Sequence, residues 1–139
     1  MTNSRTKGAS FVIHGKPFAK QRPRMTRRGI TYTPSETVSF ENTVRAVAAE
    51  KFLEPLEGPV RVIIEAHFET PKSWPKAKTA ALQGKPHIQR PDIDNIEKAI
   101  LDGLNRIAFA DDSQVCDMRT RKHWGIAGRT IVTVEAVDA

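Results

Sequence analysis

The chain is organised around one segment, which reads Arg90-Pro91-Asp92-Ile93-Asp94-Asn95-Ile96-Glu97-Lys98. Pro91 favours extended backbone in the residue before it. Residues two apart in an extended segment point the same way, so Asp92 and Asp94 are expected to project together. Apolar residues then recur at helical spacing, at Ile93, Ile96, Ile100, Leu104 and Ile107. This period predicts a helix that begins at about Asp94.

The polar face of this helix and the acidic residues after it indicate a site for a cation. Asp94, Lys98, Asp102 and Asn105 fall opposite the apolar stripe, and Asp111-Asp112-Ser113-Gln114 follows about one helix-length later. Clustered carboxylates repel one another and need a compensating charge. Mg²⁺ prefers oxygen ligands and is usually held by one or two carboxylates plus phosphate oxygens, which suits a phosphodiester-processing site. The alternative is that Asp92 or Asp94 only caps the helix.

Several motifs occur in a fixed order along the chain. They are Gly15-Lys16-Pro17, Lys20-Gln21-Arg22-Pro23-Arg24, Tyr32-Thr33-Pro34, Pro91-Asp92-Ile93-Asp94-Asn95 with Lys98, Leu101-Asp102-Gly103-Leu104-Asn105, and Asp111-Asp112-Ser113-Gln114. Together they resemble the RusA family of Holliday junction resolvases. Members of that family are small, Mg²⁺-dependent, homodimeric endonucleases that cut four-way DNA junctions by symmetric nicking.

The resemblance implies roles for particular residues. Matched position by position, the catalytic carboxylates of the family fall on Asp92, Asp94 and Asp112, and its essential lysine falls on Lys98. The same three aspartates, with Asp111 beside the last, are the expected ligands of Mg²⁺, for which Mn²⁺ is a possible substitute. The implied substrate is a four-way junction formed in DNA recombination and repair. Paired nicking needs two sites related by a two-fold axis, so a homodimer is expected.

The charge of the chain is concentrated at its N-terminal end. The net charge is +6, yet residues 1–35 hold eight Lys and Arg residues and no acid, which leaves 14 cations against 16 acidic residues in the remainder. Such a block predicts contact with a polyanion, although a solvated basic tail remains the alternative. The residues expected to bind DNA are Lys16, Lys20, Arg22, Arg24, Arg27, Arg28, Lys72, Lys76 and Arg90.

The length and composition indicate one soluble domain. A chain of 139 residues can bury one core but is short for two, so residues 1–139 are expected to form a single domain, with residues 1–9 disordered. The lone Cys116 excludes an intramolecular disulfide and fits a reducing compartment. No apolar run approaches the roughly 20 residues of a membrane helix. We expect a cytoplasmic protein of bacterial or prophage origin, with no small-molecule cofactor.

The local patterns predict an α/β (α+β) domain with a mixed sheet and two main helices. Strands are expected at residues 10–14, 29–32, 60–68, 115–124 and 130–137, and the last two should form a C-terminal β-hairpin. Residues 16–28 are expected to be an irregular loop. A Thr33-x-x-Glu36 capping box predicts a helix that extends to about Phe52, and residues 76–83 predict a shorter one.

Two other functions compete with the nuclease interpretation. The first is a non-catalytic DNA-binding protein with a metal-stabilised acidic helix start. The second is a metal-dependent phosphohydrolase acting on nucleotides, which the basic N-terminal block disfavours because a small nucleotide needs few cations. Two aromatic side chains are also ambiguous. Trp74 is expected to anchor a loop to the core rather than stack on a base, and His87 is not expected to bind metal or phosphate.

Overall fold

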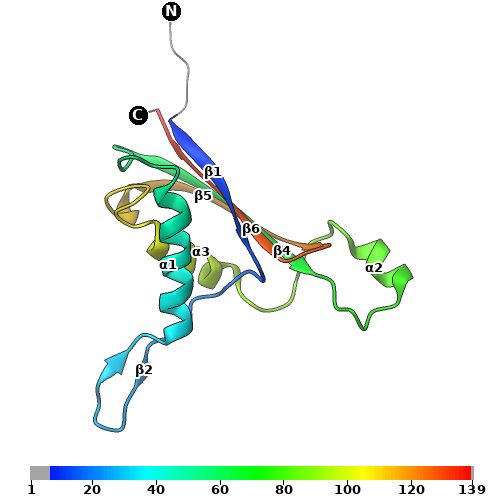
Figure 1. Cartoon of the computed structure of the whole chain (residues 1–139). Coiled ribbons are helices and arrows are strands. Elements are labelled where there is room, and N and C mark those ends of the chain that lie inside the picture. Colours follow the sequence, from blue (N-terminus) through cyan, green and yellow to red (C-terminus); the bar gives the residue numbers. More distant parts are fainter. Residues whose placement is uncertain (1–6, 139) are drawn as a thin grey trace, which may run out of the picture.

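A computed structural model describes residues 7–138 of the chain. Its elements, in order, are β1 (Gly8–His14), β2 (Arg24–Met25), β3 (Thr31–Tyr32), α1 (Ser35–Ala49), β4 (Val60–Glu69), α2 (Lys76–Leu82), α3 (Ile93–Leu104), the 3₁₀ turn η1 (Asp112–Gln114), β5 (Val115–Gly125) and β6 (Arg129–Ala136). The predicted α+β class with a mixed sheet is confirmed (Figure 1).

The main sheet has the strand order β1-β6-β4-β5. Strand β4 pairs antiparallel with β6 on one side and parallel with β5 on the other. The predicted C-terminal hairpin of β5 and β6 is therefore wrong, because β4 lies between these two strands. The connection from Gly125 to Arg129 crosses the end of β4, where Thr70 N–H donates to the Gly125 carbonyl (3.2 Å). Strand β4 is buried at every second residue and gains a full ladder on both sides from this insertion.

Helices α1 and α3 cover one face of this sheet (Figure 1). The alternate residues of β4, from Val60 to Phe68, point into the core beneath them, and Ile96, Ile100 and Leu104 of α3 are fully buried there. The two helices approach closely at Gly103, where a Cβ atom would lie 2.6 Å from Cβ of Val44. This close approach fixes the position of α3 and thereby the direction of its first turn relative to the sheet.

The start of α1 and the loop before it differ from the prediction. Pro34 is the N-cap, its carbonyl accepts from Thr37 and Val38, and no side chain caps the helix, so the predicted capping box is wrong. Within the predicted irregular loop, Arg24 and Met25 pair with Tyr32 and Thr31. The resulting β2–β3 hairpin projects beyond the N-terminal end of α1, away from the main sheet (Figure 1).

The N-terminal segment is only partly as predicted. Gly8 and Ala9, which were expected to be disordered with residues 1–7, belong to β1 and pair with Glu135 and Val134 of β6. Pairing supplies partners for their backbone groups, which composition alone does not reveal. Residues 1–6 lie outside the described part of the chain. Across residues 7–138, none of the helices has the length and apolar character needed to span a membrane.

Candidate active site

The first turn of α3 exposes two carboxylates. Asp92 is the N-cap residue, with extended backbone (φ −72°, ψ 148°), and Asp94 lies in the first turn. The Asp92 side chain makes no capping hydrogen bond, so helix capping does not account for its carboxylate. Both side chains are exposed, at the end of the helix where the macrodipole favours negative charge. They are thus available to a ligand outside the chain.

Lys98 follows one helical turn after Asp94. It is exposed and forms no ion pair with any residue between 7 and 138. Asp102, one further turn along the same face, is instead paired with Lys20, whose ammonium also lies 3.4 Å from Oε2 of Glu41. The hydrogen bond to Asp102 is the main cause that raises the pKa of Lys20. Lys20 therefore neutralises Asp102, the acidic residue with which Lys98 could otherwise pair.

The basic N-terminal segment is attached to this end of α3. Backbone N–H of Lys20 donates to the Asn95 carbonyl (2.9 Å), and Phe18 stacks on Phe40 of α1 with ring centroids 4.8 Å apart. Between the segment and the helix start lies an open groove of about 610 Å³, lined by Lys16, Pro17, Phe18, Ala19, Gln21, Arg90, Pro91, Asp92 and Asn95. Asp92 of the acidic pair therefore lines a groove that also carries Lys16 and Arg90.

Two residues of β5 hold the start of α3 and were not identified from the sequence. Nζ of Lys122 donates to the carbonyls of Gln89 and Pro91, each at 2.6 Å. The Thr120 hydroxyl donates to Oε2 of Glu97, also at 2.6 Å. The alternation of the predicted strand places Thr120 and Lys122 on the same face of the sheet. This alternation is the one sequence signal that could have indicated a shared role for the two residues.

The second acidic group stabilises its own turn. Oδ2 of Asp111 accepts from Ser113 N–H (2.9 Å), and Gln114 completes a capping box by accepting from the Asp111 N–H. The hydrogen bonds from Ser113 hold the pKa of the Asp111 carboxyl below its usual range. Gln114 also donates to the carbonyls of Leu56 and Gly58, which ties η1 to the segment before β4. Asp111 thus has a structural role, whereas the exposed Asp112 makes no side-chain hydrogen bond with a described residue.

The two acidic groups lie at opposite ends of α3. Glu97, near the helix start, accepts from Thr120 at the middle of β5, whereas Asn105, at the helix end, is bridged to Phe109, which precedes Asp111 and the start of β5. Helix α3 therefore runs antiparallel to β5. A helix that connects two parallel strands runs back antiparallel to them, so the residues before it and after it lie at opposite ends of the strands.

The predicted gathering of Asp92, Asp94 and Asp112 does not occur within one chain. Because a helix rises about 1.5 Å per residue, Asp94 is separated from the segment that follows Asn105 by roughly 16 Å. Between residues 7 and 138, no three His, Cys, Asp or Glu side chains are close enough to share a metal ion. Asp92 and Asp94 alone still fit Mg²⁺, since this ion is commonly held by one or two carboxylates with phosphate oxygens and water.

Comparison with known proteins accounts for the motifs at this site. The family model described as endodeoxyribonuclease RusA matches residues 14–135, which include the basic segment and both acidic groups. The chain belongs to the RusA family. It is 31% identical to the uncharacterized protein YqaN of Bacillus subtilis, over 93% of this chain and 96% of that protein. It is 29% identical to the crossover junction endodeoxyribonucleases RusA of Escherichia coli K12 and of Enterobacteria phage 82, over 76% of each chain.

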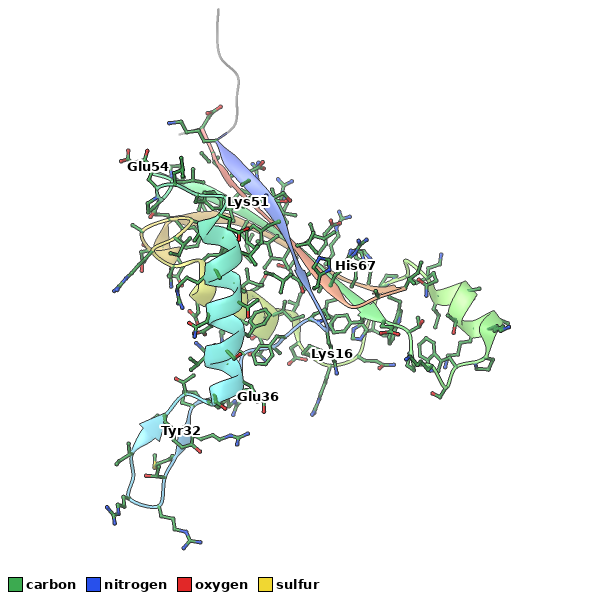
Figure 2. The ribbon with its side chains drawn as sticks, viewed as in Figure 1. Lys16, Tyr32, Glu36, Lys51, Glu54 and His67 are labelled. Carbon is green, nitrogen blue, oxygen red and sulfur yellow. The ribbon has the colours of Figure 1, made fainter. Side chains whose placement is uncertain are left out.

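The basic residues of this RusA family member occupy three places. Arg22, Arg24, Arg27 and Arg28 are exposed on or beside the β2–β3 hairpin; Lys16 and Arg90 line the groove; and Lys72 and Lys76 are exposed before and at the start of α2. Figure 2 shows Lys16 where β1 leaves the sheet, and it places Tyr32 and Glu36 at the hairpin end of α1, opposite Lys51 and Glu54. Lys20 differs from the other predicted DNA-binding residues, because its charge is already paired.

The two ambiguous aromatic residues pack against the core. His87 is buried and stacks on Phe68, with ring centroids 3.9 Å apart. Burial is the main cause that lowers its pKa. Trp74 packs edge-on against Trp124 at 4.8 Å, and the ammonium of Lys78 lies 4.2 Å from the Trp74 ring. The packing interpretation of both residues is supported, and neither is part of the candidate site.

Proposed function

We propose that this protein is a Mg²⁺-dependent endodeoxyribonuclease that resolves four-way DNA junctions by paired nicking in recombination and repair. The observation that supports the proposal most strongly is the family match over residues 14–135, combined with the exposed Asp92, Asp94 and Lys98 on one helix start. The relatives from Escherichia coli and phage 82 carry the name crossover junction endodeoxyribonuclease. The junction substrate is carried over from those names.

Asp92 and Asp94 are the residues proposed to hold the metal. Their carboxylates are exposed and have no hydrogen-bonding or ion-pair partner among residues 7–138, so the cation would meet no competing protein group. When bound, Mg²⁺ supplies positive charge toward the scissile phosphate and toward the attacking water. The protein orients this pair through α3, whose first turn is held by Lys122 and Lys20.

Lys98 is proposed to stabilise the charge that develops on the non-bridging phosphate oxygens. Its ammonium is free because Lys20 pairs with Asp102, the acid four residues after Lys98. A cation that is already directed at the developing charge stabilises the transition state more than a cation that must first leave a carboxylate. The hairpin arginines and the groove residues Lys16 and Arg90 would neutralise flanking phosphates and orient the junction, without reading base sequence.

One experiment separates this proposal from its competitors. Synthetic four-way junctions and linear duplexes of matched length are incubated with the protein, with and without Mg²⁺. A junction resolvase nicks the junction in a metal-dependent manner and leaves the duplex largely intact. Binding of the junction without nicking would favour the non-catalytic DNA-binding protein. Hydrolysis of free nucleotides, with neither binding nor nicking of the junction, would favour the phosphohydrolase. Mn²⁺ in place of Mg²⁺ should also sustain nicking.

A further inference from the structure

A second pocket adjoins the groove at the start of α3. It has a volume of about 670 Å³, and Lys16 and Arg90 line both this pocket and the groove that contains Asp92. We propose that the pocket binds one unstacked base of the DNA strand whose phosphate lies at Asp92. The inference rests on the proposed nuclease function and extends it, because it assigns a binding site to a nucleotide beside the cut.

Aromatic side chains form the inner wall of this pocket. His87 is stacked on Phe68, with ring centroids 3.9 Å apart, and its ring centroid lies 4.5 Å from that of Trp124. All three residues line the pocket, and each of them is 6% exposed or less. The wall is therefore already packed in the absence of a ligand. A concave apolar wall of this kind suits a planar ligand such as a base.

His87 brings an unpaired polar atom to the aromatic wall. The residue is only 5% exposed, and its Nδ1 makes no hydrogen bond with any residue between 7 and 138. Burial, together with the cations of Lys122 and Lys16, lowers the pKa of His87, so the ring is neutral near pH 7 and has one donor and one acceptor. A buried polar atom without a partner is unfavourable. The edge of a base presents donors and acceptors that could supply the missing hydrogen bond.

The wall is fixed to the start of α3 through one lysine. His87 N–H donates to the carbonyl of Lys122 (3.0 Å), and the ammonium of Lys122 donates to the carbonyls of Gln89 and Pro91. Pro91 directly precedes Asp92 in the chain. A base held against His87 would therefore have a defined position relative to the carboxylate, which is what positioning of a phosphodiester for attack requires.

The charges around the pocket favour a nucleic acid as the ligand. Lys16, Lys72 and Arg90 line the pocket and are exposed, whereas Glu69 is the one acidic residue among the described residues that line it. Residues 70–90 as a whole contain five Lys and Arg residues and no acid. Lys16 and Arg90 stand between the groove and the pocket, so a strand that continues past Asp92 would bring its next phosphates to these two cations.

A branched substrate presents an unstacked base at lower cost than a linear duplex. Each base inside a duplex is paired and is stacked on both sides, whereas the exchange of strands at a branch point interrupts the stack. Extrusion of a base costs least where stacking and pairing are already weakened. Occupation of the pocket would therefore favour cleavage beside a branch point and disfavour cleavage within linear duplex.

The two tryptophans of the chain report directly on this pocket. Trp124 lines it and Trp74 packs edge-on against Trp124, so a base bound there should quench their fluorescence. The protein is titrated in Ca²⁺ with an intact four-way junction and with junctions that carry one abasic nucleotide at successive positions near the branch point. The intact junction should quench. One abasic position should remove the quenching and weaken binding about ten-fold, the scale for loss of one base contact.

Two results of this titration would overturn the inference. The first is quenching of equal size by the intact junction and by every abasic junction, since no single base would then be responsible. The second is binding of the intact junction without any quenching, since the pocket would then stay empty.

A pair of neighbouring variants tests the pocket from its rim. Ala127 is exposed and lines the pocket, whereas Ile126 is 87% exposed and does not line it. Ala127→Phe should fill the space, reduce the quenching and remove the ten-fold effect of the abasic nucleotide. Ile126→Phe adds the same ring beside the pocket and should behave like the wild type. Equal behaviour of the two variants would contradict the inference.

His87→Phe tests the polar atom separately from the shape of the wall. Phenylalanine can keep the packing against Phe68, and thermal melting checks that the variant is folded. The wild type should bind junctions that differ only in the base at the identified position with different affinities, and His87→Phe should reduce those differences. Unchanged differences in a folded variant would exclude His87 as the group that contacts the base. If this variant does not fold, the pair at positions 126 and 127 still decides.

The failure of this inference can be told apart from the failure of the proposed function. Nicking of junctions without any abasic position that affects quenching or binding would retain the nuclease and overturn the base pocket. Quenching that depends on one base, without nicking, would retain the pocket and overturn the nuclease. Tighter quenching by a free deoxynucleoside monophosphate than by the junction would assign the pocket to small nucleotides and overturn the inference.

Discussion

The ammonium of Lys20 is paired with the carboxylate of Asp102, two helical turns after Asp94 on the same face of α3. Lys20 comes from the basic segment that the sequence assigns to DNA binding, yet its charge is used inside the protein. The pair fastens that segment to α3, and it leaves Lys98 without an acidic partner among residues 7–138.

Replacing Lys20 should affect stability more than junction binding. Lys20→Met leaves Asp102 and Glu41 without their cation and should lower the free energy of unfolding by roughly 1 kcal/mol, the upper end for a partly exposed pair. Since pairing raises the folded-state pKa of Lys20, its stabilisation is complete below the unfolded pKa of about 10.4 and is lost as pH rises through the folded value. Urea unfolding from neutral to alkaline pH measures this. The prediction would be contradicted if the difference in free energy of unfolding between the wild type and Lys20→Met stayed unchanged at high pH. An equal loss of stability in an exposed Lys51→Met control would also contradict it.

Removing single carboxylates should separate cleavage from binding. Asp92→Asn, Asp94→Asn and Asp112→Asn should each abolish nicking while junction affinity is kept or increased, because each removes a proposed metal ligand and a negative charge that would face phosphate. Junction binding in Ca²⁺ and single-turnover nicking in Mg²⁺ measure the two effects. Parallel loss of binding in all three variants would indicate misfolding instead of a lost catalytic group.

Asp111 should behave differently from its neighbour. Asn is as good an N-cap as Asp, so Asp111→Asn should keep η1 and most of the nicking rate, whereas Asp111→Ala removes the acceptor for Ser113 N–H and should lower the melting temperature. Thermal melting beside single-turnover nicking distinguishes the two variants. Complete inactivity of a stable Asp111→Asn variant would assign Asp111 to the metal site.

Lys98 should matter for rate and hardly at all for stability. Lys98→Ala should lower the single-turnover rate by about two to three orders of magnitude, the scale for loss of one preorganised electrostatic donor. The melting temperature should stay constant, because the described structure gives Lys98 no ion pair to lose. Lys98→Arg keeps the charge with altered geometry and should restore part of the rate. A normal rate in Lys98→Ala would exclude the catalytic role.

The hairpin arginines should control affinity and its salt dependence. Alanine at Arg22, Arg24, Arg27 and Arg28 should weaken junction binding and reduce the slope of log affinity against log salt by about one unit per lost phosphate contact. Nicking at saturating protein should be comparatively well preserved. Lys51→Ala, at the opposite end of α1, serves as a control for the loss of one positive charge away from the hairpin and is compared with each single arginine substitution (Figure 2). An unchanged slope in the hairpin variant would mean that these arginines are only solvated.

Local sequence patterns were sufficient to predict individual helices and strands. The apolar period from Ile93 to Leu104 predicted α3 to within one residue at its start, and the alternation from Val60 predicted β4. Pairing between distant segments was harder to predict. The turn after Gly125 is compatible with a hairpin, but β4 inserts there because a long, half-buried strand gains hydrogen bonds on both edges.

The sequence by itself determined which side chains are available for chemistry: an Asp-x-Asp pair at a helix start, a lysine one turn later, a second acidic group and a basic segment. Only the tertiary structure decided which of them meet. Helix α3 returns antiparallel to its flanking strands, so order along the chain becomes separation along the strands, and the helix alone places Asp94 roughly 16 Å from the segment that follows Asn105 and carries Asp112. The same folding brings Lys20 to Asp102, 82 positions away along the chain, because packing joins residues that no local pattern relates.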